Sequence, residues 1–199
     1  MITFLNTDFG NQPVADQAWF NEVKRLGHRG LGTSVNRWNS TEFWPMAGVI
    51  VDRTLTAGLV PFVYCRLPEG WENGLKGLGT LAAKLSWFEA DVEPETGIHP
   101  VTDAHLEGLV KSGQRAAIYT NAGMWAPSMG YDPGVHFAAW PLHDRGIRAT
   151  TPTGMKQAPL VTFGGWNTQH YMRRIWQCRD GIDVAGVACD LNVVDGRWL

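Results

Sequence analysis

The chain has 199 residues, of which 44% are hydrophobic and 18% charged, a composition typical of a globular protein with an apolar core. Its net charge of −2 gives no basic surface of the kind that binds nucleic acid or anionic membranes. It also has no run of about 18 consecutive apolar residues, which argues against a transmembrane helix. We therefore predict a single domain spanning residues 1–199.

The cysteines and histidines of the chain predict no metal site. Cys65, Cys178 and Cys189 are odd in number and lack CxxC spacing, and the six histidines form no HxH or HxxxH pair. No cofactor is therefore predicted. The N-terminal segment lacks the basic region and long apolar run of a secretory signal, so we expect synthesis in a cytosol.

The chain alternates between strand-like and helix-like segments up to residue 120 and then continues without predicted helices. Strands are predicted at residues 2–6, 30–37, 59–65, 85–93 and 115–120, and helices at 14–26, 43–57, 75–84 and 102–112. Further strands are predicted at 135–140, 158–163, 172–178 and 187–192, with a Gly/Pro-rich loop at 126–134. Alternating strands and helices indicate a parallel sheet, and this length favours a barrel over an open sheet.

Polar residues recur where the predicted strands end. In a parallel barrel the C-terminal ends of all strands converge on one face, which is where active sites lie. Residues that are far apart in the sequence would therefore meet there. The residues at these positions are Asp8, Arg37, Tyr64, Asp91, Glu93, Asn121 and Asp190.

The most acidic strand reads WFEADVE at residues 87–93. Because side chains alternate between the faces of a strand, Glu89, Asp91 and Glu93 would share one face. Burying several carboxylates together is costly, and it is the arrangement in which one carboxyl group keeps its proton beside charged neighbours. The pattern therefore indicates an acid/base site. The alternative is a solvated edge strand whose charges face water.

Four motifs in this order resemble glycoside hydrolase family 25, the Chalaropsis-type lysozymes or N-acetylmuramidases that are common among phage endolysins. The motifs are DVE at 91–93, IYTNAGMW at 118–125, FGGWNTQHYMRRIWQC at 163–178 and VAGVACDLNVVDG at 184–196. The resemblance covers nearly the whole chain. It implies an α/β fold: a modified TIM-like barrel with five β/α units followed by antiparallel strands.

The resemblance also implies roles for four acidic residues. Glu93 is similar to the general acid that protonates the leaving glycosidic oxygen. Asp91 resembles its partner, which acts on the substrate's N-acetyl group or on water. Asp190 matches the acid of the last strand, although it could instead cap a turn with Asn192. Asp8 matches the acid at the end of the first strand. Such a cluster fits a glycosidase, which needs one protonated and one ionised carboxyl group.

Aromatic and polar residues near the strand ends are predicted to contact the sugar chain. Flat aromatic rings stack on the C–H faces of sugars, although each of these rings could equally pack inside the barrel. Gln177 could bind a sugar or a backbone group. The predicted substrate-binding residues are Tyr64, Asn121, Trp125, Trp140, Gln177 and Arg37.

The sequence departs from the family pattern in three places. The first strand reads NTDFGN where the family has G-[IV]-D-V-S. The third ends in Tyr64-Cys65-Arg66 where the family has Tyr-His-Phe. Glu89 is an additional acid deeper in the barrel. Arg37 or Arg66 could pair with Glu89, and without such a partner it should be protonated.

The resemblance predicts a muramidase that cleaves the β-1,4 bond between N-acetylmuramic acid and N-acetylglucosamine in peptidoglycan. Its partner would be the peptidoglycan glycan strand, and it would act at the bacterial cell wall after synthesis in the host cytoplasm, alone or on a phage virion. An alternative is a non-catalytic glycan-binding or structural barrel in a phage tail or baseplate, in contact with tail proteins. A metal-dependent deacetylase is a third hypothesis, disfavoured by the lack of paired histidines.

Overall fold

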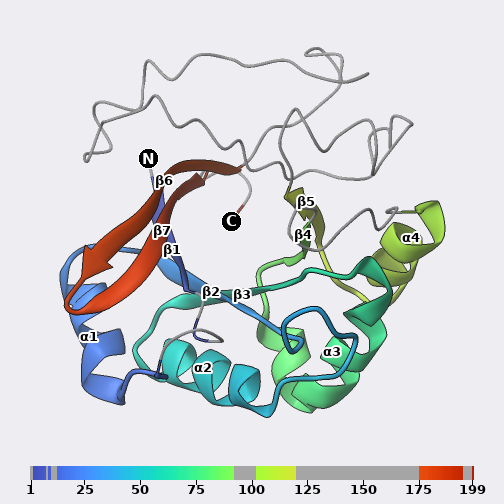
Figure 1. Cartoon of the computed structure of the whole chain (residues 1–199), viewed down its shortest axis with the longest axis horizontal. Coiled ribbons are helices and arrows are strands. Elements are labelled where there is room, and N and C mark those ends of the chain that lie inside the picture. The colour runs from blue at the N-terminus through green and yellow to red at the C-terminus, as the bar shows by residue number, and fades with distance from the viewer. Residues whose placement is uncertain (1, 8, 10–12, 92–101, 120–174, 195–198) are drawn as a thin grey trace.

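The computed structural model describes residues 2–7, 9, 13–91, 102–119, 175–194 and 199. Within these residues one seven-stranded sheet has the order β5-β4-β3-β2-β1-β7-β6. Figure 1 shows the helices α1, α2 and α3 along one side of this sheet. The strands are β1 (Ile2–Thr7), β2 (Gly30–Ser34), β3 (Val60–Cys65), β4 (Phe88–Asp91), β5 (Ala116–Tyr119), β6 (Ile175–Val184) and β7 (Val187–Val194).

Strands β1 to β5 are parallel neighbours in chain order, and β7 and β6 add antiparallel to the free side of β1. The predicted α/β class, with parallel strands followed by antiparallel ones, is therefore confirmed for the described residues. In that part of the chain β5 and β6 are the two edges of the sheet. Closure of the sheet into a barrel stays a prediction. The strands predicted at 135–140 and 158–163 lie outside the described residues.

The helices begin and end where local signals favour it. Asp16 caps α1 by accepting a hydrogen bond from the backbone N–H of Trp19, and Thr102 and His105 form a capping box on α4. Positive φ angles at Gly27, Gly58 and Gly113 follow α1, α2 and α4. The helical segments are α1 (Gln17–Arg25), α2 (Pro45–Thr56), η1 (Pro68–Gly70), α3 (Trp71–Leu78), η2 (Gly79–Lys84) and α4 (Asp103–Lys111).

The single helix predicted at 75–84 is wrong in two respects. The α-helix α3 starts earlier, at Trp71, and ends at Leu78. Gly79 then adopts a φ of 57°, which no α-helix continues through, and the chain proceeds as the 3₁₀ segment η2. No described helix is long and apolar enough to span a membrane.

The hairpin of β6 and β7 extends beyond the strand predicted at 172–178. Strand β6 continues to Val184 because two register shifts absorb its polar segment around Gly181. Ala185 and Gly186 form the two-residue turn, both with positive φ (51° and 84°). This is the geometry of a type I′ turn, which matches the twist of the two strands.

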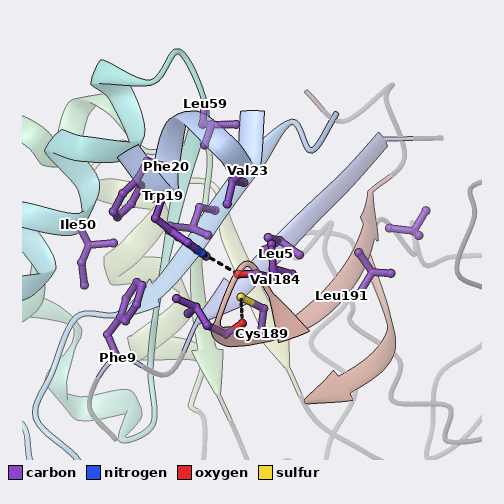
Figure 2. Close-up of a cluster of buried hydrophobic side chains, with 13 residues drawn as sticks. Leu5, Phe9, Trp19, Phe20, Val23, Ile50, Leu59, Val184, Cys189 and Leu191 are labelled. Carbon is purple, nitrogen blue, oxygen red and sulfur yellow. Dashed lines mark hydrogen bonds between the residues drawn. The ribbon is translucent and has the colours of Figure 1, made fainter. Parts of the chain in front are cut away.

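The face of the sheet that the helices cover carries two apolar clusters. One of them packs α1 and part of α2 against β1, β2 and β7, and Figure 2 shows its side chains. Within it the indole Nε1 of Trp19 donates a 2.7 Å hydrogen bond to the carbonyl oxygen of Val184. This contact joins the first helix to the hairpin at the far end of the chain. The other cluster lies between α2, α3, α4 and strands β3 to β5.

The opposite face of the sheet carries an aromatic cluster near the start of the parallel strands. Phe62 and Trp87 stack with ring centroids 4.3 Å apart, and Phe4 lies 5.2 Å from Trp87. Two glycines of β2 make room for these rings, since a Cβ on Gly30 or Gly32 would lie 2.0 Å from Phe4 or Phe62. On this face the aromatic rings precede the buried acids of β4, which lie closer to the C-terminal end of the strand.

Candidate active site

Two carboxyl groups of β4 lie on the face that carries the aromatic cluster. Glu89 and Asp91 alternate with Phe88 and Ala90, which pack on the helix side. Both acids are buried, with 4% and 5% of their surface exposed, and β4 lies between β3 and β5. The solvated edge strand is therefore the wrong interpretation. The shared face predicted for Glu89 and Asp91 is confirmed, whereas Glu93 lies outside the described residues.

Asp91 lies beside Arg66, the residue that follows β3. Arg66 Nε is 3.7 Å from Asp91 Oδ2, and the two side chains are only 13% and 7% exposed. The guanidinium carbon of Arg66 also lies 3.4 Å from the ring centroid of Trp38. A cation stacked on an aromatic face in this way gains electrostatic energy from the ring. Arg66 therefore bridges the loop after β2 and the end of β4.

Glu89 contacts a different group, one layer deeper. Its Oε2 accepts a 3.1 Å hydrogen bond from the indole Nε1 of Trp87. The structure pairs Arg66 with Asp91, whereas the sequence suggested Arg37 or Arg66 as a partner of Glu89. Arg37, the other arginine considered for Glu89, lies 3.9 Å from Glu42 at the surface, where both side chains are largely exposed. An exposed pair of this kind contributes little to stability.

Cys65 lies next to Arg66 in the chain but points into the apolar cluster on the helix side. Burial raises the pKa of the Cys65 thiol well above its ordinary value, and the negative charges of Asp91, Glu69 and Glu89 raise it further. The thiol is consequently protonated at neutral pH and is a poor nucleophile. The carboxyl groups, not the cysteine, are the chemically useful groups at this end of β3 and β4.

Tyr64 lies on the same face as Glu89 and is its direct neighbour across β3 and β4. The ring is buried among Phe62, Trp87 and other members of the aromatic cluster. Its hydroxyl donates a 3.3 Å hydrogen bond to the carbonyl oxygen of Thr7, at the end of β1. The ring therefore links two strand ends, and its contact with a sugar stays a prediction.

The hairpin brings Asp190 and Gln177 to the sheet from the other side. Asp190 pairs with Asn6 of β1, so it lies toward the C-terminal end of the parallel strands. Its Oδ1 accepts a 2.9 Å hydrogen bond from the backbone N–H of Gly181, at the irregular part of β6. Gln177 is buried and lies opposite Asn192. Asp190 thus stabilises the irregular part of β6 around Gly181.

A pocket of about 540 Å³ opens between the end of β2 and the start of α2. Asn36 shapes its rim, because its side-chain amide donates to the carbonyl oxygens of Thr41 and Gly70. Trp38 is 45% exposed and stands at the point where the pocket meets Arg66. The described lining residues are Ser34, Asn36, Arg37, Trp38, Trp44, Pro45 and Met46.

The described part of the chain places several predicted site residues toward the C-terminal ends of the parallel strands. Asp91, Tyr64 and Arg37 lie near the ends of neighbouring parallel strands, and Asp190 lies on the adjoining hairpin. The sequence interpretation overlooked Trp38 and the pairing of Arg66 with Asp91. The signal for both was their place directly after a strand. The predicted residues outside the described part are Glu93, Asp8, Asn121, Trp125 and Trp140.

Metal chemistry has no candidate in the part of the chain that the structure describes. There, no three His, Cys, Asp or Glu side chains lie close enough to hold an ion. The arrangement can support acid/base chemistry, because the Asp91 carboxyl group lies beside a guanidinium and the Glu89 carboxyl group lies two positions earlier on the same strand.

Comparison with known proteins finds one curated relative and several solved structures of similar fold. No family model matches the chain. A curated protein of Dictyostelium discoideum, described as probable GH family 25 lysozyme 4, is 29% identical over 113 residues. The match covers 54% of this chain and 48% of the relative, so it spans about half the length of that protein.

Solved structures share the fold. The CTP1L endolysin superposes over 100% of this chain and 68% of its own, with a TM-score of 0.66 and 16% identity. An uncharacterized B. stearothermophilus protein has a TM-score of 0.61 and 17% identity, and the superposition covers 100% of this chain and 98% of that protein. The autolysin LytC of Streptococcus pneumoniae was solved in complex with a synthetic peptidoglycan ligand. It has a TM-score of 0.61 and 12% identity, and the superposition covers 96% of this chain and 46% of LytC. These structures show that the chain shares their fold, and the curated relative agrees with the resemblance drawn from the sequence: over about half of its length the chain is similar to a glycoside hydrolase family 25 lysozyme.

Proposed function

We propose that this protein is a peptidoglycan hydrolase, a muramidase that cleaves the β-1,4 bond between N-acetylmuramic acid and N-acetylglucosamine. The observation that carries the proposal is the buried Asp91 beside Arg66 at the C-terminal end of β4. It is the first residue of the Asp-x-Glu sequence, and Glu93 is the second. The lysozyme relative and the endolysin-like fold support the same assignment.

The proposed reaction divides the work between two carboxyl groups. Glu93 is the general acid, which gives its proton to the leaving glycosidic oxygen as the bond breaks. Asp91 is ionised and acts on the substrate's N-acetyl group or on the attacking water. The Arg66 guanidinium favours the ionised state of Asp91 because opposite charges attract at short range. Asp190 and Asp8 are proposed to assist from the hairpin and from the first strand.

The glycan strand is proposed to lie across the strand ends and to enter the pocket beside α2. Trp38 and Trp44 offer aromatic surface there, and Arg37 offers a positive charge. A carboxylate of the muramic acid or its peptide would suit that charge. Tyr64, Gln177, Asn121, Trp125 and Trp140 complete the proposed set of sugar contacts. Closure of the sheet into the family's modified barrel belongs to this proposal.

The proposed place of action is the bacterial cell wall. The protein would be made in the host cytoplasm and would reach the wall either as a free enzyme or as part of a phage virion. In the second case phage tail proteins are its proposed partners.

A wall-release assay tests the proposed activity. Purified peptidoglycan carrying a covalently attached dye is incubated with the wild type, Asp91→Asn, Glu93→Gln and Arg25→Met. Wild type and Arg25→Met should release dye equally, because Arg25 pairs with Glu22 on the exposed surface of α1. The two carboxyl variants should lose activity by about 10²–10⁴-fold, the usual contribution of acid/base catalysis.

Circular dichroism of each variant shows whether it is folded. Full activity of folded Glu93→Gln would contradict the proposal. A wild type that binds walls but releases no dye from several wall types would favour the non-catalytic glycan-binding module.

A further inference from the structure

We propose that Arg66 is a positioning residue for Asp91, and that the indole of Trp38 holds the Arg66 guanidinium in place. The inference rests on the proposed function, in which Asp91 acts in ionised form. It concerns a position where this chain has arginine in place of an aromatic residue of the family pattern.

Burial makes the pairing between Arg66 and Asp91 energetically significant. Their side chains are 13% and 7% exposed, so neither charge is well solvated. A buried carboxylate without a compensating partner is costly and takes up a proton instead. The nearby guanidinium therefore favours the ionised state of Asp91.

The distance between Arg66 Nε and Asp91 Oδ2 indicates that this contact stabilises charge without a short hydrogen bond. The 3.7 Å between Arg66 Nε and Asp91 Oδ2 exceeds hydrogen-bond length, so this contact is electrostatic. An electrostatic contact of this length favours the ionised form of the carboxylate. A bidentate pair would instead occupy both carboxylate oxygens.

Trp38 explains why the guanidinium stays at that distance. The guanidinium carbon lies 3.4 Å from the ring centroid, which is stacking contact. The planar guanidinium stacks on an aromatic ring better than the compact ammonium of lysine does. Trp38 also lines the pocket, so a ligand that fills the pocket contacts the side chain that holds Arg66.

Arg66 is a cation in the group of charged and titratable side chains that the structure describes around Asp91. Tyr119 of β5 lies opposite Asp91, and Tyr64 of β3 lies opposite Glu89, which precedes Asp91 by two positions on β4. The surrounding charged and titratable groups in the described residues are Glu89 on β4, Arg66, Tyr64 and Cys65 at the end of β3, Glu69 on η1, and Tyr119 on β5.

The first test is the pH dependence of kcat/KM for wild type, Arg66→Met, Arg66→Lys and Trp38→Leu on soluble peptidoglycan fragments. Loss of the positive charge raises the pKa of the Asp91 carboxyl, so the acidic limb of Arg66→Met should move up by about one pH unit or more. Arg66→Lys keeps the charge and should recover most of that shift. Trp38→Leu should move the limb in the same direction by less.

Arg25→Met is the matched control, because it removes an arginine from an exposed carboxylate pair on α1. Its profile should overlay that of the wild type. An Arg66→Met profile that also overlays the wild type would overturn the inference. So would an Arg66→Lys profile shifted as far as that of Arg66→Met.

The second test does not depend on catalysis. Urea unfolding of wild type, Arg66→Met, Asp91→Asn and the double variant forms a double-mutant cycle. The double variant should be less destabilised than the sum of the single variants, because removing both charges leaves no buried charge alone. Additive effects would overturn the pairing. A wild type without hydrolytic activity would contradict the proposed function, and the cycle would still decide the pairing.

Discussion

Two acids on one strand, equally buried, have different chemical surroundings. Glu89 lies beside the Trp87 N–H in the aromatic cluster, whereas Asp91 lies beside the Arg66 guanidinium at the strand end. A neutral donor and a full positive charge stabilise a carboxylate to different extents. We therefore propose Asp91, the side chain nearest the strand end, as the ionised catalytic group.

The two described thiols predict a dependence of stability on alkaline pH. Burial, with smaller contributions from Asp190 and Asp183, raises the pKa of Cys189 from 9.0 to about 12, and the pKa of Cys65 is raised as well. Between pH 9 and about 12 the unfolded chain loses these protons first, so the free energy of unfolding falls as the pH rises.

This fall is measured by urea unfolding of wild type and Cys189→Ala from neutral pH to about pH 11. The variant should show a shallower fall, because one of the titrating thiols is gone. Identical pH dependence in the two proteins would show that the Cys189 thiol does not contribute. Slow reaction of the native thiols with iodoacetamide is the accompanying observation expected for buried, protonated groups.

At the scale of single residues, the sequence predicts on which face of a strand a side chain lies better than it predicts which residue that side chain contacts. The period-two pattern of WFEADVE correctly places Glu89 and Asp91 on one face, because alternation is a property of any strand. It cannot say which arginine meets which acid, since Arg66 and Asp91 belong to different strands and meet only through the sheet register. The contact of Trp38 with Arg66 depends on a loop conformation, which has no periodicity to read.

Among the elements, the β6–β7 hairpin carries a correctable strain at its turn. Ala185 has a φ of 51°, a conformation that costs a residue with a Cβ about 1–2 kcal/mol. Asn is the preferred residue at this turn position, before Gly186. Ala185→Asn should therefore raise the urea midpoint, by a free energy of up to about 1 kcal/mol. Gly186→Ala, which places a Cβ at a φ of 84°, should lower it. A lower midpoint for Ala185→Asn would contradict this account of the turn.

Two glycines, Gly32 in β2 and Gly48 in α2, should respond in opposite ways to replacement by alanine. Gly32→Ala would place a methyl group 2.0 Å from the Phe62 ring and should destabilise the protein by about 1–3 kcal/mol through overpacking. Gly48 lies inside α2 with open space at its Cβ, so Gly48→Ala should stabilise by about 0.5–1 kcal/mol. Urea unfolding of the two variants measures both signs, and equal effects would contradict the packing described for β2.

Elements with strong local signals are the ones the sequence predicts well. Alternating strands and helices up to β5 are confirmed, with helix ends marked by Gly27, Gly58 and Gly113. The failures have local causes. Gly79 ends α3 by a positive φ that composition does not reveal, and the bulges of β6 keep a polar, glycine-containing segment in a strand.

At the scale of the whole molecule, strand order brings the site together. The parallel strands lie in chain order from β1 to β5, and the hairpin joins β1 from the other side. Asp91 and Asp190 are far apart in the sequence, yet both lie toward the C-terminal ends of the parallel strands. The sequence predicted this arrangement from the polar residues at the predicted strand ends, because the C-terminal ends of parallel strands lie on the same side of a sheet. The roles proposed for Asp91 and for the other site residues rest on the family resemblance.

The most direct measurement of the central claim is mass spectrometry of purified peptidoglycan digested with wild type and with Glu93→Gln. We predict muropeptides with a reducing N-acetylmuramic acid end from the wild type, and none from the variant. Products with a reducing N-acetylglucosamine end, products released by peptide cleavage, or the same products from both proteins would contradict the claim that this site is a muramidase in which Glu93 is the acid.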